Sequence, residues 1–154
     1  MGTYLLLGFT SSGKTTIGKM VAEKTGYDFI DLDHLIEAGE NKSVSRIFAE
    51  EGEEYFRKLE KKYLHEAIQN DNIIISTGGG VPCFFDNMDC MNAQGTTIYL
   101  KFTPEQLKMR LELSSQNKRP LVAGRSGDEL LQYITDTLSE RECHYSKASH
   151  ILQG

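Results

Sequence analysis

The chain carries, seven residues from its start, the stretch Gly8-Phe9-Thr10-Ser11-Ser12-Gly13-Lys14-Thr15. It is a complete G-x-x-x-x-G-K-[ST] phosphate-binding loop. Backbone N–H groups of such a loop point at phosphate oxygens, and Gly8 and Gly13, which lack a Cβ, let the backbone come close enough. Lys14 then reaches the β- and γ-phosphates, and the Thr15 hydroxyl ligates Mg²⁺. The stretch therefore predicts a nucleotide site.

A phosphate-binding loop lies between a strand and a helix, and the segments on both sides of this loop are typical of those two elements. Thr3 to Leu7 is typical of a short buried strand. After the loop, Ile17, Met20 and Val21 predict the apolar face of a helix that ends at Gly26. The start of that helix would turn its positive end toward the phosphates. Strand, loop and helix in this order favour a functional phosphate loop over a chance Gly/Ser turn.

The composition is that of an ordinary globular domain. The 154 residues fit one domain, 1–154, with 39% hydrophobic and 25% charged residues and a net charge of -5. This balance gives no indication of nucleic-acid binding. Without a basic leader or a run of ~18 apolar residues, we expect a cytoplasmic protein with no membrane contact. The three cysteines and four histidines lack metal-ligand spacing, and we interpret the cysteines as reduced thiols.

Two carboxylates follow the next extended segment, Tyr27 to Ile30. Alternation along a strand would place Asp31 and Asp33 on one face at its C-terminal end. In an open α/β sheet, ligands bind at that edge, where the phosphate loop also lies. One acid would serve Mg²⁺ and the other a substrate hydroxyl. The alternative for Asp33 is an N-cap for a helix that starts near His34.

The region at about 32–69 is rich in helix formers. Breaks at Gly39 and Gly52 suggest two or three short helices folded against one another. One face of the last helix is apolar, and it consists of Phe56, Leu59, Tyr63 and Ala67.

Arg57 and Glu60 lie beside that face, three residues apart. As a surface ion pair they would contribute only ~0.2–0.5 kcal/mol. Alternatively, Arg57 is an anion clamp that Glu60 orients.

Ile73 to Ile75 then predicts a buried strand that runs into three consecutive glycines, Gly78 to Gly80. The triplet Gly78, Gly79 and Gly80 leaves the backbone open to a closely approaching ligand.

Strands and helices continue to alternate in the second half of the chain. Arg141 falls on the apolar stripe of the last helix, where a cation must reach water or find an anion. Residues 114–127 are polar and long enough to form a mobile lid that carries Arg119. The expected elements are a helix at Phe84–Ala93, a strand at Thr96–Leu100, a helix at Thr103–Leu113 with Thr103 as N-cap and Pro104 in first position, a last helix with Leu130, Ile134, Leu138 and Tyr145 on one stripe, and a strand at Ser149–Leu152.

This alternation predicts an α/β fold, with a five-stranded parallel sheet in a three-layer α/β/α sandwich. Across nearly its whole length the chain also resembles the shikimate kinases, P-loop kinases related to the nucleoside monophosphate kinases. The matching motifs are the phosphate loop, Asp31-Leu32-Asp33, Ser43-Val44-Ser45-Arg46-Ile47-Phe48, Gly52-Glu53-Glu54-Tyr55-Phe56-Arg57-Lys58-Leu59-Glu60, Thr77-Gly78-Gly79-Gly80, Arg119-Pro120-Leu121 and Arg141-Glu142-Cys143-His144-Tyr145.

The resemblance implies a P-loop NTPase fold of the nucleoside monophosphate kinase type and ATP-dependent phosphorylation of shikimate by a monomer. It implies that Lys14, Asp33 and Arg119 are catalytic, with Arg119 moving in with the lid. Thr15 and Asp31 would serve Mg²⁺, Asp31 in the outer shell. ATP would contact Ser11, Ser12, Gly13, Lys14, Thr15, Thr16 and Arg119, and shikimate would contact Asp33, Arg57, Gly78, Gly79, Gly80 and Arg141.

Two features depart from the family pattern: Ser11 stands where the fourth loop position is usually glycine, and the sequence ends at Gly154, soon after the fifth predicted strand.

One alternative function is a kinase for another small hydroxylated acceptor, such as gluconate. A P-loop GTPase switch is the alternative from a different class. It predicts an N-K-x-D guanine motif, which the sequence lacks, because Asn41-Lys42 is followed by Ser43-Val44.

Overall fold

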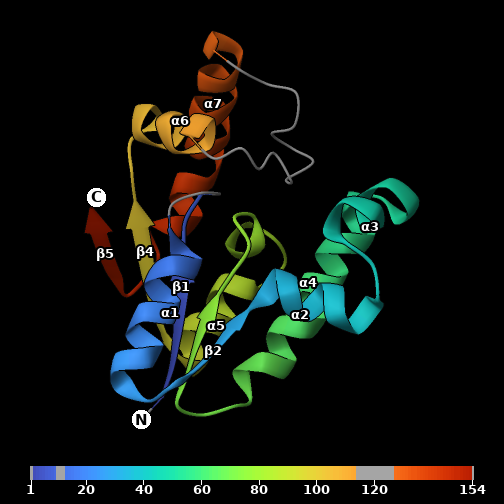
Figure 1. Ribbon diagram of the computed structural model, residues 1–154, viewed down its shortest axis with the longest axis vertical. Helices are drawn as coiled ribbons and strands as arrows, with labels where there is room; N and C mark the ends of the chain where they lie inside the picture. The colour runs from blue at the N-terminus through green and yellow to red at the C-terminus, as the bar shows by residue number, and fades with distance from the viewer. Residues whose placement is uncertain (1, 10–12, 114–126, 154) are drawn as a thin grey trace.

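The computed structural model describes residues 2–9, 13–113 and 127–153. Its centre is a five-stranded sheet in the order β2-β3-β1-β4-β5, in which every neighbouring pair is parallel. Figure 1 shows the strands with their carboxyl ends at one edge. The strands are β1 (Thr3–Leu7), β2 (Asp28–Asp31), β3 (Ile73–Ser76), β4 (Thr96–Lys101) and β5 (His150–Gln153). The helices are α1 (Lys14–Thr25), α2 (Leu32–Glu40), α3 (Val44–Glu51), α4 (Glu53–Ile68), α5 (Asn87–Gln94), α6 (Pro104–Leu113) and α7 (Gly127–Tyr145), with a 3-10 turn, η1 (Val81–Cys83).

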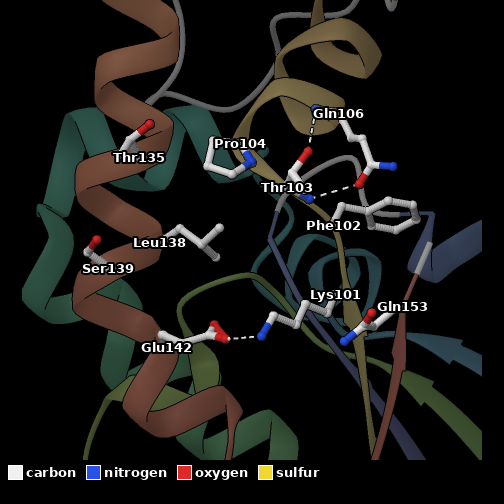
Figure 2. A pocket seen from close by; sticks show the side chains of 10 residues that line it. All are labelled: Lys101, Phe102, Thr103, Pro104, Gln106, Thr135, Leu138, Ser139, Glu142 and Gln153. Carbon is white, nitrogen blue, oxygen red and sulfur yellow. Dashed lines mark hydrogen bonds and ion pairs between the residues drawn. The ribbon is translucent and has the colours of Figure 1, made fainter.

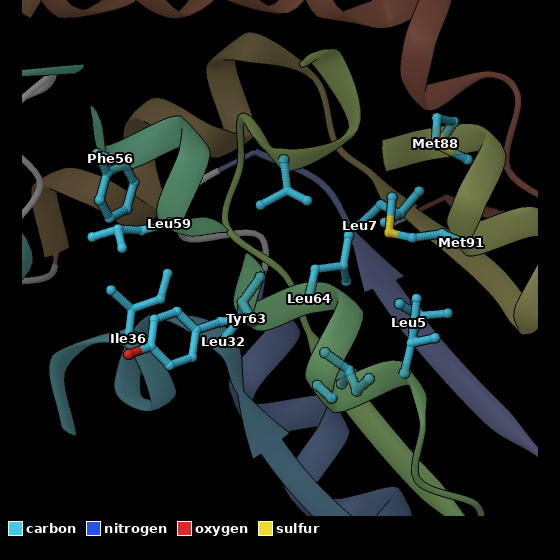
Figure 3. Packing of buried hydrophobic residues seen from close by; sticks show 14 of the residues in the cluster. Leu5, Leu7, Leu32, Ile36, Phe56, Leu59, Tyr63, Leu64, Met88 and Met91 are labelled. Carbon is cyan, nitrogen blue, oxygen red and sulfur yellow. The ribbon is translucent and has the colours of Figure 1, made fainter. Parts of the chain in front are cut away.

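Helices cover both faces of the sheet, which confirms the predicted three-layer α/β/α sandwich. Leu5 and Leu7 of β1 point to the face where α2, α4 and α5 pack, and they belong to the largest core cluster. Figure 3 shows this packing, with Leu64 of α4 and Met91 of α5 around the two leucines. Leu6 points to the opposite face, toward α1. Side chains that alternate along a strand that is buried on both faces account for this division.

Two helices form a unit of their own beyond the carboxyl ends of the strands. Figure 1 shows α6 and α7 there, and Phe9 of the phosphate loop packs into the cluster between them. The predicted N-terminus of α6 is confirmed. The Gln106 N–H donates to Thr103 Oγ1 at 3.1 Å, and Gln106 Oε1 accepts the Thr103 N–H at 2.8 Å, a reciprocal capping box.

The predicted division of the region at about 32–69 into short helices is confirmed by α2, α3 and α4, although two predicted helix bounds along the chain are displaced. Gly39 is the second-last residue of α2, which ends at Glu40, and an added Cβ at Gly39 would fall 2.1 Å from the Tyr63 hydroxyl, so close packing favours glycine there. The helix predicted from Phe84 begins only at Asn87, because Phe85 adopts φ 53°, which no helix continues. The break at Gly52, between α3 and α4, is confirmed.

The predicted apolar face of α1 is not buried. Ile17, Met20 and Val21 are 36%, 52% and 43% exposed, and the helix instead buries Gly18 and Ala22 against the sheet. Ile17 and Val21 line an apolar cavity of about 280 Å³ over the strands. Within the described ranges, no helix is both long and apolar enough to span a membrane.

Candidate active site

The phosphate loop connects β1 to α1 as predicted. Gly13 is the N-cap of α1 with φ 89°, a left-handed conformation that favours glycine. The Lys14 ammonium is buried and donates to the carbonyl oxygens of Gly8 and Phe9 at 2.7 and 3.0 Å. The lysine is therefore folded along the loop, close to where phosphates would bind. Ser11 and Ser12 lie outside the described residues, and Thr16 follows Thr15 in the first turn of α1.

Thr15 and Asp31, the two predicted metal residues, meet across 16 residues of sequence. The Thr15 hydroxyl donates to Asp31 Oδ2 at 3.1 Å. Hydroxyl and carboxylate oxygens are the ligands that Mg²⁺ prefers, together with phosphate and water oxygens. Among the described residues, no three His, Cys, Asp or Glu side chains form a metal cluster. The donor set thus fits an ion that a nucleotide brings with it rather than one held by protein alone.

Asp33 lies in the first turn of α2, so the expectation that both carboxylates stand on one strand face is wrong. The strand β2 ends at Asp31, which caps α2 by accepting the Asp33 N–H on Oδ1 at 3.0 Å. Asp31 is therefore the N-cap, and the alternative interpretation of Asp33 as a cap is also wrong. The Asp33 side chain is buried, only 7% exposed.

Arg57 and Glu60 form a buried ion pair, not a surface one. They are 5% and 1% exposed, and Arg57 Nη1 lies 2.8 Å from Glu60 Oε1. Glu53 binds the other side of the guanidinium, 3.0 Å from Nη2. Burial opposes the charge on Arg57, but the two carboxylates outweigh it and raise its pKa. The guanidinium also stacks on the Phe84 ring, 4.4 Å from its centroid.

The glycine triplet packs directly against these charged groups. A Cβ added at Gly78 would lie 2.9 Å from Glu60 Oε2 and 3.3 Å from Asp33 Oδ1. A Cβ added at Gly80 would lie 2.6 Å from Arg57 Nη1. Side chains at these positions would therefore displace the ionised groups. Gly78 and Gly80 thus admit protein side chains close to the backbone, and close approach of a ligand to the triplet stays a prediction.

Arg141 of α7 converges on the same place. Its charge and that of Arg57 both act on the Cys83 thiol, although burial dominates and raises the pKa of Cys83 to about 11. Arg141 also lies over the Phe9 ring, 5.7 Å from its centroid. Arg57 lies against Gly80, and Arg141 interacts with the Tyr145 hydroxyl that donates to Gly79, so arginines from two helices lie beside the triplet. Arg119 and the predicted lid, apart from Gly127, lie outside the described residues.

Sequence reasoning missed some residues of this region. Arg110 of α6 stacks on Phe102 at 4.4 Å and reaches the loop, where a Cβ added at Gly13 would lie 3.6 Å from its Nη1. Nothing in the sequence distinguishes Arg110 from the other charged residues of this polar helix. Tyr145 is predicted on an apolar stripe and as the end of the R-x-x-x-Y motif, without a role of its own, yet its hydroxyl donates to the carbonyl oxygen of Gly79. The R-x-x-x-Y spacing was the available signal.

A cavity of about 520 Å³ lies apart from these groups, between α7, the start of α6 and the ends of β4 and β5. Figure 2 shows Leu138 pointing into it and Lys101 paired with Glu142, whose closest atoms are 3.1 Å apart. None of the predicted site residues that the structure describes lines it. We take the candidate active site to be the region from the phosphate loop to the glycine triplet, where the predicted residues that the structure describes lie.

Comparison with known proteins identifies the family of this chain. A family model described as shikimate kinase matches residues 10–154. A shikimate kinase from Parabacteroides distasonis is 52% identical over 149 residues, which cover 97% of this chain and 86% of the relative.

Two solved structures are similar over the full fold. The crystal structure of shikimate kinase from Bacteroides thetaiotaomicron has a TM-score of 0.94 and 43% identity, and covers 99% of this chain and 86% of its own. Shikimate kinase from Acinetobacter baumannii, solved in complex with shikimate, has a TM-score of 0.89 and 31% identity, and covers 100% of this chain and 84% of its own.

Proposed function

Because this chain belongs to the shikimate kinase family, we propose that it transfers the γ-phosphoryl group of ATP to the 3-hydroxyl of shikimate, giving shikimate 3-phosphate and ADP. The observation that carries the proposal is the arrangement around the glycine triplet: Asp33 lies against Gly78, Arg57 lies against Gly80, and Arg141 interacts with the Tyr145 hydroxyl that binds Gly79. Two cations fit one carboxylate, and a buried carboxylate fits a hydroxyl that must lose a proton.

Each half of the site has its own task in this proposal. Lys14 stabilises negative charge on the β- and γ-phosphates as it develops. The oxygens of Thr15 and Asp31 would hold Mg²⁺, with Asp31 in its outer shell, and the bound ion would neutralise phosphate charge. Arg119 would add a further cation from the predicted lid.

In the acceptor half, Arg57 and Arg141 bind the carboxylate of shikimate, and backbone groups of Gly78 to Gly80 bind its hydroxyls. Asp33 orients the reacting hydroxyl. As the new O–P bond forms and the bond to the ADP oxygen breaks, the hydroxyl proton passes to the Asp33 carboxylate. Every residue assigned comes from one chain, so we also propose that a monomer is sufficient.

A coupled assay of ADP release tests the proposal with four acceptors: shikimate, gluconate, quinate and a nucleoside monophosphate. We expect ADP release that requires Mg²⁺ and depends on shikimate far more than on the others. Arg141→Ala should raise the KM for shikimate and leave the KM for ATP nearly unchanged, because Arg141 lies in the acceptor half. Equal turnover with gluconate would favour the alternative acceptor, and no acceptor-dependent ADP release at all would contradict a kinase function.

A further inference from the structure

Tyr145 links the last turn of α7 to the glycine triplet. The residue is fully buried, and its hydroxyl donates to the carbonyl oxygen of Gly79, which is 66 residues away in sequence. The guanidinium of Arg141 interacts with the same hydroxyl. A phenylalanine would fill the core as well as the tyrosine ring does, so the hydroxyl needs its own explanation.

The three carbonyl groups of the triplet have different partners. Those of Gly78 and Gly80 accept backbone N–H groups from the η1 turn that follows, at 3.1 and 3.0 Å. The carbonyl of Gly79 accepts the Tyr145 hydroxyl. The local turn therefore orients the outer two carbonyls, and a distant side chain orients the middle one. Without a Cβ, a glycine peptide has more orientations open to it than any other, so this bond restricts a flexible point.

The orientation of that peptide determines where the next N–H points. In a planar trans peptide, the Gly79 carbonyl and the Gly80 N–H point in opposite directions. The bond from Tyr145 thus fixes the Gly80 N–H on the side away from α7. Gly80 is also in contact with Arg57, since an added Cβ would lie 2.6 Å from its Nη1.

Tyr145 is itself held in place from the side of the 520 Å³ cavity. The Tyr99 ring packs against the Tyr145 ring with 4.9 Å between centroids. The Tyr99 hydroxyl donates to Glu142 Oε2 at 2.8 Å, and Glu142 Oε1 lies 3.1 Å from the Lys101 ammonium, the pair drawn in Figure 2. This series of contacts leaves the Tyr145 ring little freedom to turn its hydroxyl away from Gly79.

We propose that Tyr145 is a positioning residue for the acceptor: its hydroxyl holds the Gly79–Gly80 peptide so that the Gly80 N–H is presented to an acceptor hydroxyl. The inference rests on the proposed function, which places shikimate beside the triplet. It adds a residue that does not touch substrate but sets the direction of a group that does.

The test compares two single hydroxyl deletions in the full chain. Tyr145→Phe removes the bond to Gly79, together with the interaction of the hydroxyl with Arg141, and keeps the ring. Tyr63→Phe is the matched control, because Tyr63 also donates one hydrogen bond, to Glu40 Oε2 at 2.7 Å, but from the core between α2 and α4. For Tyr145→Phe we expect the KM for shikimate to rise roughly tenfold, the worth of one hydrogen bond, with the KM for ATP unchanged. The control should change neither constant.

The outcomes separate this inference from the proposed function. If wild-type protein releases no ADP with shikimate, the proposed function fails. If wild type is active and Tyr145→Phe has the same KM for shikimate as Tyr63→Phe, the positioning role is refuted. Circular dichroism checks that both variants are folded. Should Tyr145→Phe not fold, Tyr99→Phe gives the second test: it removes the bond to Glu142 and should raise the KM for shikimate, and an unchanged KM would refute the role.

Discussion

Replacement of Glu60 by glutamine should destabilise the fold far more than the same change at Glu53. Both carboxylates bind Arg57, but Glu60 is 1% exposed, whereas the Glu53 side chain is 49% exposed. Removing one partner of a buried pair costs ~3–5 kcal/mol when the remaining charge is left alone. In Glu60→Gln the remaining charge is not left alone, because Arg57 still has Glu53 at 3.0 Å and the glutamine side chain retains one acceptor oxygen. The expected loss is therefore that of a charge-assisted hydrogen bond, ~1.5–3 kcal/mol.

This loss is large enough to measure in two ways. Urea denaturation gives the free energy of unfolding directly, and thermal melting gives a Tm lowered by about 3–12 °C, since each kcal/mol shifts the Tm of a domain this size by ~2–4 °C. Glu53→Gln should cost at most ~1 kcal/mol, as solvent-exposed pairs do. If the two variants unfolded with the same free energy, Arg57 would not be held from the buried side, and its orientation as an anion clamp would need another cause.

The remaining predictions concern the phosphate loop, the paired carboxylates and α1. Lys14→Ala should lower kcat by at least ~10²-fold, as loss of one electrostatic donor does, with an unchanged circular dichroism spectrum. Asp33→Asn should lower kcat by ~10²–10⁴-fold, the contribution of a general base, whereas Asp31→Asn should chiefly raise the Mg²⁺ concentration required, and asparagine would still cap α2. On α1, urea denaturation should find Met20→Gln within ~0.5 kcal/mol of wild type. Gly18→Ala should cost ~1–3 kcal/mol through overpacking, since its Cβ would lie 2.4 Å from a phenylalanine ring of β2.

The fold could be predicted from the sequence because its signals are local. Alternating strands and helices, a phosphate loop and a capped helix at Thr103 each depend on residues within a few positions of one another. The buried face of α1 could not be predicted in this way, because periodicity identifies an apolar stripe but does not show whether another element covers that stripe. Met20 is 52% exposed, whereas the small residues Gly18 and Ala22 meet the sheet. The helix packs so closely on the strands that only small side chains fit between them, and such residues do not stand out in an apolar pattern.

The sequence also could not predict that the charged side chains of Arg57 and Glu60 are buried. An arginine and a glutamate three residues apart look the same on a surface helix as in a core. Only the fold brings α2, α4 and the triplet together around Arg57 and Glu60. The contact of Tyr145 with Gly79 spans 66 residues and depends on where α7 crosses the sheet edge. Motifs thus named the candidate site residues and, for Arg57, its partner Glu60, while the burial of the pair and the contact of Tyr145 with Gly79 needed the fold.

The D-x-D spacing follows from the geometry at the start of α2. Asp31 uses both of its carboxylate oxygens: Oδ1 accepts the N–H of Asp33 at 3.0 Å, and Oδ2 accepts the Thr15 hydroxyl at 3.1 Å. An aspartate that caps a helix bonds the N–H two or three residues later, so the second aspartate falls in the first turn of the helix. Its own side chain is then buried toward Gly78 rather than toward the loop. Two hydrogen bonds through Asp31 therefore link Asp33 at the start of α2 to Thr15 at the start of α1, and a shift of α2 would move both residues together.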